Sequence, residues 1–347
     1  MRPSLTTLAT ALLSAALSAS AAPIPVPHGG QPTQQRQNIK PQRAAKFAAT
    51  SNPIANYPAD SFQRNAWAVL NHDRLQCGFP ALAQNAALDR AAQAHALYMT
   101  NNPLWARTPH TETAGLAGFT GNTPADRALA AGFNGGSVTE SILHAWDWSS
   151  VPMVNMSNSS GVHYALGYHE EIVKAFDWNN AIGLGIMFWT SAAGATVANY
   201  GVAGPLPAVE PNTVLTYPCE GSSGTATGST MEIDNLYPGY PGNFAGPPIL
   251  VQTSPSSKIK LTSASLTNAD RAEIPYYFAL VNPESDPKHV LKPYQALVVP
   301  QSNLMANTRY NANITGTVNG MPFSRNFTFK TGTGSDPDSW ASYRSAN

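Results

Sequence analysis

Residues 110–142 read HTETAGLAGFTGNTPADRALAAGFNGGSVTESI, and the rest of the first half of the chain is organised around them. Thr123 and Asp126 can cap a helix reciprocally, since each side chain can bond the backbone amide of the other. Pro124 suits the first helical position because its missing N–H has no partner there in any case. Gly132 can take the positive φ that ends a helix. The stretch therefore predicts a helix of about two turns.

His110 and Glu140 stand on either side of this short helix, 30 residues apart. That interval is much longer than the ligand spacing of a zinc finger. We expect the two side chains to cooperate only if the tertiary structure brings them together.

The N-terminus has the three parts of a secretory signal peptide in residues 1–21. Arg2 is followed by the apolar run LATALLSAALSA and by the small residues Ala19-Ser20-Ala21 at the cleavage position. The run is too short to span a bilayer. Residues 22–58 then read as a disordered linker rich in Pro, Gln, Ala and Ser. These features predict a secreted protein, extracellular or periplasmic, that does not span a membrane.

Charge is sparse and unevenly distributed. Asp, Glu, Lys and Arg make up 12% of the chain, against about 25% in typical soluble domains. No acidic residue precedes Asp60, so a basic tail is joined to a mildly acidic body, and the formal net charge is +0. Nothing in this pattern resembles a nucleic-acid-binding footprint.

Apolar periodicity predicts helices and then strands up to about residue 205. Residues 60–77 should form a helix capped by Asp60 or Ser61, and residues 86–101 a second helix capped by Asn85. His95 lies on the apolar face of the second helix, which favours a hydrogen-bonded core histidine over a ligand. The remaining segments are a short helix or strand-to-helix turn (139–148), a helix (163–176) and two strands joined by a hairpin turn (183–189 and 196–202).

From about Pro205 helical periodicity disappears. Short β-branched or aromatic runs alternate with Pro, Gly and Ser turns, which is typical of an antiparallel β-sandwich of about seven strands. We predict a domain over 59–205, a β-sandwich over 212–332 and a disordered tail over 333–347. The fold class is thus α+β.

The chain has two cysteines, Cys77 in the first domain and Cys219 at the start of the second. In an oxidising compartment they could form a disulfide that ties the domains together. Two separate buried thiols fit the sequence equally well, because connectivity cannot be read from spacing.

Residues 60–203 resemble the bacterial form of the CAP domain (cysteine-rich secretory proteins, antigen 5, pathogenesis-related 1). The matching segments occur in the family's order and at its intervals: LNHDRLQCGFPALAQNAALDRAAQAHALYM, PHTET, NTPADRALAAGF, TESI, YHEEIV and IGLGIMF. The resemblance implies an α-β-α sandwich around a central cleft. Residues 212–332 are similar to the bacterial Ig-like domains that often follow, on the segments LMANTRYNANITGTVNG and FTFKTG.

The resemblance also implies a cleft lined by two histidines and one or two glutamates that can hold a divalent cation, Zn²⁺ or Mg²⁺. By motif, His110 matches the first histidine, Glu140 the glutamate, and His169 the second histidine, with His163 as its alternative. The chain departs from the family where Ser141 replaces the usual Asn after the glutamate. No residue clearly matches the family's other cleft glutamate, for which Glu112, Glu170 and Glu171 are weak substitutes.

Three functions fit this cleft. The first is a binding module for a lipid, a sterol or a cell-envelope component, with the Ig-like domain as an adhesive spacer. The second is a metal-dependent hydrolase of peptide or cell-wall substrates, with Glu140 as base to a metal-bound water. The third is a buried polar network that only rigidifies the cleft. The sequence assigns no catalytic residue.

Overall fold

The structure is a computed structural model that describes residues 53–102, 110–145, 166, 169–188, 194–228, 246–269 and 278–333. All of them lie in one compact unit, residues 39–347. The predicted signal peptide, most of the linker and nearly all of the C-terminal tail lie outside the described residues. No helix among the described residues is long and apolar enough to cross a membrane.

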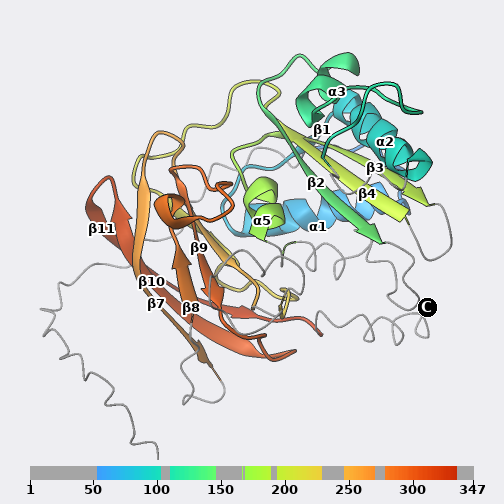
Figure 1. Cartoon of the computed structure of the whole chain (residues 1–347). Coiled ribbons are helices and arrows are strands. Elements are labelled where there is room, and N and C mark those ends of the chain that lie inside the picture. Colours follow the sequence, from blue (N-terminus) through green and yellow to red (C-terminus); the bar gives the residue numbers. More distant parts are fainter. Residues whose placement is uncertain are drawn as a thin grey trace, which may run out of the picture. The chain divides into compact units, whose positions relative to one another are not determined.

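A four-stranded sheet forms the centre of the first domain (Figure 1). Its order is β1 (Ala83–Gln84), β3 (Ala181–Phe188), β4 (Gly194–Gly201) and β2 (Val138–Ala145). The pair β1–β3 is parallel and the other pairs are antiparallel.

Helices cover both faces of this sheet (Figure 1). Helices α2 (Ala86–Asn101) and α3 (Pro124–Ala130) pack on one face, where Leu88 and Ala128 share a cluster with Ala181. Helices α1 (Phe62–Gln76) and α5 (His169–Ala175) pack on the other. The first domain is therefore an α-β-α sandwich, as the resemblance implies.

The period of two along β3 explains this layering. Ile182 and Leu184 point into the core shared with α1 and α5. Gly183 and Gly185 point the other way, where a Cβ would lie 2.0 Å and 2.3 Å from the backbone of α2. Glycine at these two positions lets α2 lie directly on the sheet.

The described residues of the second half form seven strands in two antiparallel sheets. One sheet has the order β11-β10-β7 and the other β5-β6-β9-β8. A buried apolar cluster with residues from both sheets, including Val251, Val298, Ile314 and Phe327, lies between them. The strands are β5 (Val214–Tyr217), β6 (Ile249–Thr253), β7 (Ile259–Asn268), β8 (Phe278–Val281), β9 (Gln295–Pro300), β10 (Arg309–Val318) and β11 (Met321–Lys330). The prediction of about seven strands is confirmed, while the Ig-like identity stays a prediction.

Local capping predictions are confirmed. Ser61 caps α1 by accepting from Arg64 N, and Asn85 caps α2 by accepting from Ala87 N and Leu88 N. Thr123 and Asp126 form the predicted reciprocal cap of α3, whose end is followed by Gly132 at φ +89°.

The prediction of a helix or strand-to-helix turn at 139–148 is wrong. Residues 138–145 are strand β2, paired along its whole length with β4. The segment TESILHAW has apolar residues that fit either period. The antiparallel ladder with β4, whose paired residues lie 49 to 63 positions further along the chain, decides for the strand. Residues 146–148 lie outside the described part.

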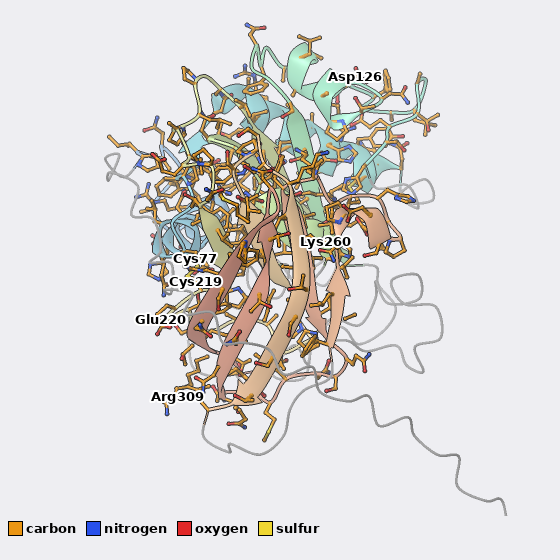
Figure 2. The ribbon with its side chains drawn as sticks, turned by 90° about the vertical axis from the view of Figure 1, so that its left-hand side faces the viewer. Cys77, Asp126, Cys219, Glu220, Lys260 and Arg309 are labelled. Carbon is orange, nitrogen blue, oxygen red and sulfur yellow. A yellow bond between two sulfur atoms is a disulfide. The ribbon has the colours of Figure 1, made fainter. Side chains whose placement is uncertain are left out.

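Cys77 and Cys219 form a disulfide with a Cα–Cα distance of 5.4 Å, which Figure 2 shows as a sulfur–sulfur bond. A continuous apolar cluster also crosses the predicted domain boundary, with Phe176 stacked on Tyr217 at 4.1 Å between ring centroids. Trp178 Nε1 donates to Thr253 O at 2.9 Å, and Gln252 Nε2 to Phe176 O at 3.0 Å. The two domains therefore share one apolar cluster, beside the clusters that each domain has of its own.

We predict that the double variant Cys77→Ser/Cys219→Ser still unfolds in one cooperative transition, because the shared core remains. The free energy of unfolding should fall by about 2–5 kcal/mol, since the bond closes a loop with a sequence separation of 142. Urea unfolding followed by both far-UV circular dichroism and tryptophan fluorescence measures this. Two separated transitions would contradict a shared core.

Candidate functional site

A buried arginine, Arg127, connects the parts of the site. It directly follows Asp126 of the α3 capping box, and its side chain is 0% exposed. Nη2 lies 2.8 Å from both carboxylate oxygens of Glu140 on β2. Nη1 faces the carbonyl oxygens of the loop before α3, at 3.3 Å from His110 and 3.4 Å from Gly121 and Asn122. One guanidinium therefore joins the loop, the short helix and the sheet edge.

Glu112 and His95 extend this network inward. His95 Nδ1 lies 2.8 Å from Glu112 Oε1, and both side chains are fully buried. Glu112 also accepts from the backbone amides of Thr120 at 2.6 Å and Gly121 at 3.3 Å, which fixes the loop. His95 is thus the hydrogen-bonded core histidine that the sequence predicted, and Glu112 is its partner.

His110 lies at the opening of the network. Its side chain is 34% exposed, whereas that of Glu140 is fully buried. His110 Nδ1 is 3.2 Å from Glu140 Oε1. Because an ionised carboxylate only accepts, we assign the ring proton to Nδ1, which leaves the lone pair on Nε2 directed outward.

Glu140 is held ionised. Burial by itself would raise the pKa of this carboxyl, but the hydrogen bond from His110 and the nearby charge of Arg127 outweigh burial and hold the pKa below its usual range. Asn199, paired with Glu140 in the β2–β4 register, donates to Glu140 Oε2 at 3.0 Å once its amide is oriented by its partners. Both oxygens of Glu140 are therefore engaged by protein donors.

Helix α5 supplies the charged groups outside His110. Lys174 Nζ lies 3.3 Å from His110 Nε2, 3.4 Å from Glu170 Oε2 and 3.5 Å from Glu171 Oε1. Glu170 and Glu171 precede Lys174 by four and three residues, so one turn of helix places both carboxylates beside the ammonium. Burial raises the pKa of Glu171. Burial would also raise the pKa of the more exposed Glu170, but the positive charges of Lys174 and Lys288 outweigh it and lower that pKa.

His169 faces the second domain. Its Nε2 lies 3.7 Å from Asp286 Oδ1, just after the short 3-10 helix η2 (Pro283–Ser285), and the side chain is 2% exposed. Within the described residues neither ring nitrogen makes a hydrogen bond. Burial lowers the pKa of His169 to about 4, with Lys288 acting in the same direction and Asp286 and Glu170 opposing.

Of the predicted cleft residues, the structure brings His110 and Glu140 together and places His169 against Asp286. The alternative histidine, His163, lies outside the described residues. Among the residues described, no three His, Cys, Asp or Glu side chains form a group that could hold a metal ion. The donors implied for Zn²⁺ or Mg²⁺ therefore do not converge: Glu140 is engaged by Arg127 and Asn199, and Lys174 faces the outward nitrogen of His110.

Sequence reasoning missed Arg127 and Lys174 as members of the site. The sequence did contain a signal for Arg127. It directly follows the capping box in a glycine-rich, weakly charged segment, and an arginine that is buried there needs a carboxylate partner. The sequence contained no such signal for Lys174, because a Glu–Lys pair four residues apart usually marks the solvent-exposed face of a helix.

Comparison with known proteins identifies the first domain. Residues 67–200 match the model of the cysteine-rich secretory protein family, CAP. This segment is therefore a CAP domain, and the match does not reach the β-sandwich. No curated protein matches the chain in sequence.

Among solved structures, one match is an extracellular protein containing a SCP domain from Bacillus anthracis str. Ames. It is 14% identical, with 44% of this chain and 45% of that chain covered, and the TM-score is 0.31. This chain thus covers less than half of that protein, and a likeness at this level carries no argument about function.

We predict that Arg127→Met destabilises the fold by about 3–5 kcal/mol, because Glu140 would be left as an uncompensated buried charge. The double variant Arg127→Met/Glu140→Gln should cost less than the sum of the two single changes, since neither charge is then unpaired. Urea unfolding of the four proteins in this cycle measures the coupling. Arg90→Met is the matched control, because Arg90 is exposed and should cost less than about 1 kcal/mol. Strict additivity would contradict a coupled ion pair.

We predict a pH dependence of stability from His169. Its pKa is lower in the folded protein than the ordinary 6.5, so the unfolded chain binds the extra proton first as pH falls. The stability is fully present above pH 6.5 and is lost towards pH 4, by about 2 kcal/mol between pH 7 and pH 5. Urea unfolding at both pH values measures it. His169→Gln should reduce this difference, and an unchanged difference would show that another group causes it.

Proposed function

We propose that this chain, whose residues 67–200 form a CAP domain, is a secreted binding module that takes a charged group of a cell-envelope component at His110. The observation that carries the proposal is the exposure of His110 at the mouth of an otherwise buried ionic network. A network that only stabilised the fold would not need a side chain that is exposed to solvent, as His110 is. The disulfide supports an oxidising, extracellular setting.

The groups around the outward face of His110 favour a charged ligand over an apolar one. Lys174 lies beside His110, and Lys288, from the second domain, reaches Glu170 Oε1 at 3.4 Å. Glu170 thus sits between two ammonium groups, one from each domain. An anionic group of a ligand, carboxylate or phosphate, could compete with Glu170 for both. A sterol or an uncharged lipid would find no such complement among these residues.

The second domain has two roles in this proposal. Lys288 and Asp286 bring it to the edge of the cleft, at Glu170 and His169 of α5. Its β-sandwich, as an Ig-like domain, would also serve as the spacer that presents the CAP domain. The shared apolar cluster supports the first role, because it contains Leu291 of the second domain together with Ile172 and Val173 of α5.

A metal-dependent hydrolase, the alternative function, has less support. Glu140 was the candidate base, but its carboxylate is fully buried and both oxygens are engaged. A general base must reach the proton that it abstracts, directly or through one water. Glu140 would have to release Arg127 or His110 to do so.

The proposal is tested by co-sedimentation of the purified protein with peptidoglycan sacculi, with phosphatidylglycerol vesicles and with phosphatidylcholine vesicles with and without cholesterol. We expect binding to the anionic targets, weakened about tenfold or more by His110→Ala or Lys288→Gln, since a charge-assisted hydrogen bond contributes about 1.5–3 kcal/mol. His72→Ala is the matched control, because His72 is exposed on α1.

Binding to none of these targets would overturn the proposal. A preference for cholesterol-containing vesicles, unchanged in Lys288→Gln, would replace it with the sterol-binding function.

A further inference from the structure

The outward face of the sheet β11-β10-β7 carries a shallow depression that is rich in hydroxyl and amide groups. Buried and outward residues alternate along β10 and β11, and the buried set fills the core of the sandwich. The depression has a volume of about 410 Å³, within the range of about 300–1,000 Å³ that is usual for ligand sites. Six uncharged polar residues line it: Ser265, Thr267, Asn311, Asn313, Asn326 and Thr328.

The pairing of the three strands sets these side chains in two rows. Each row has one residue from each strand: Thr267, Asn311 and Thr328 in one, and Ser265, Asn313 and Asn326 in the next. Neighbouring strands lie about 4.8 Å apart and successive outward residues about 7 Å apart, so the rows form a regular grid. A regular grid suits a ligand whose polar groups also repeat.

The fold gains little from the asparagines of this grid. Asn is depleted in strands, where β-branched and aromatic side chains pack better. Asn311 and Asn313 nevertheless stand on β10, the central strand, and Asn326 faces Asn313 across the β10–β11 ladder. Within the described residues, no hydrogen bond reaches the exposed side chains of Asn313 and Ser265. These polar groups are therefore available to a ligand.

The charged groups of this face lie around the depression, with one exception. Arg309 pairs with Lys330 at one end of the β10–β11 ladder, and Figure 2 shows Lys260 towards the opposite end of the sheet. None of these three cations lines the depression. The exception is Glu220, whose Oε2 accepts from Thr328 N at 2.8 Å. One carboxylate is thus fixed at the edge of β11, with its other oxygen able to accept a further hydrogen bond.

This chemistry selects an uncharged ligand that is rich in hydroxyl groups. Hydroxyl and amide groups both donate and accept hydrogen bonds, as the hydroxyl groups of a sugar do. A carboxylate accepts from a hydroxyl more strongly than a neutral acceptor does. An anionic polymer would meet the Glu220 carboxylate and no cation inside the depression, and an apolar ligand would leave buried amides unpaired.

We propose that the outward face of β11-β10-β7 is a second binding site, which takes the glycan chain of an uncharged polysaccharide. Asn311 and Asn313 bond sugar hydroxyls at the centre of the grid, and Glu220 accepts from one at its edge. Individual hydrogen bonds contribute little, so a short oligosaccharide binds weakly and a polymer with many repeats binds more tightly. The site goes beyond the proposed function, because it shares no residue with the group around His110 and takes a ligand without charge.

The test is co-sedimentation of the purified protein with four insoluble uncharged polysaccharides: cellulose, chitin, β-1,3-glucan and starch. We expect saturable binding to at least one of them. Asn311→Val/Asn313→Val should weaken that binding at least about tenfold, because two hydrogen-bonding groups are lost. Valine favours strands, so this variant should unfold at the same urea concentration as the wild type or a higher one.

Thr317→Val is the matched control. Thr317 is on β10 and on the same outward face, but it lies outside the depression, so this variant should bind as the wild type does. Glu220→Gln keeps the size of the side chain and removes the charge, and it should weaken binding about threefold or more.

Three results would overturn the inference. The first is no binding to any of the four polymers, and the second is binding that Asn311→Val/Asn313→Val leaves unchanged. The third is a dimer, detected by analytical ultracentrifugation, that the same variant dissociates, because a second copy of the chain would then cover this face. The four polymers carry no anionic group, so these results are independent of whether an anionic envelope component binds at His110.

Discussion

The buried pair of Arg127 and Glu140 is the constraint on which the rest of the site depends. An ionised carboxylate with no exposed surface is tolerated only if it is fully paired. Arg127 supplies that pairing and, through its other nitrogen, binds the carbonyl oxygens of the loop that carries His110. Arg127 therefore positions His110 without contacting the imidazole ring. It binds the backbone carbonyl of His110, and it pairs with the Glu140 carboxylate that sets the His110 tautomer. The outward nitrogen of His110 is available to Lys174 for the same reason.

The second domain constrains the site through helix α5. Gln295 Nε2 donates to Val173 O at 3.2 Å, and Tyr294 and Lys292 both bind the Asp177 side chain just beyond α5. Helix α5 has only seven residues and would be marginal alone. Packing against the β-sandwich holds it, and with it Glu170, Glu171 and Lys174. The CAP domain and the sandwich are thus one structural unit. The charged groups near His110 come from both: Glu170, Glu171 and Lys174 from α5, and Lys288 from the second domain.

Local elements could be predicted where the signal is local. The caps at Ser61, Asn85 and Thr123 involve residues two or three positions apart, and all three formed as expected. The seven strands that the structure describes in the second half were also predictable, because turn residues separate them regularly. Strand β2 was not, because its eight residues satisfy both periods and only pairing with β4 settles the choice. The disulfide was one of two equal alternatives for a similar reason, since it joins residues that only the fold places 5.4 Å apart at Cα.

By itself, the sequence predicted the α+β class, most of the helices, the seven strands that the structure describes in the second half, and His110 and Glu140 as candidate site residues. These depend on short-range chemistry or on motifs of fixed order. Only the tertiary structure decided that Arg127 neutralises Glu140, that His169 turns towards Asp286 and that Lys174 takes the open nitrogen of His110. The physical reason is that a buried charge is specified by its partners, and those partners come from segments 13 to 117 residues away.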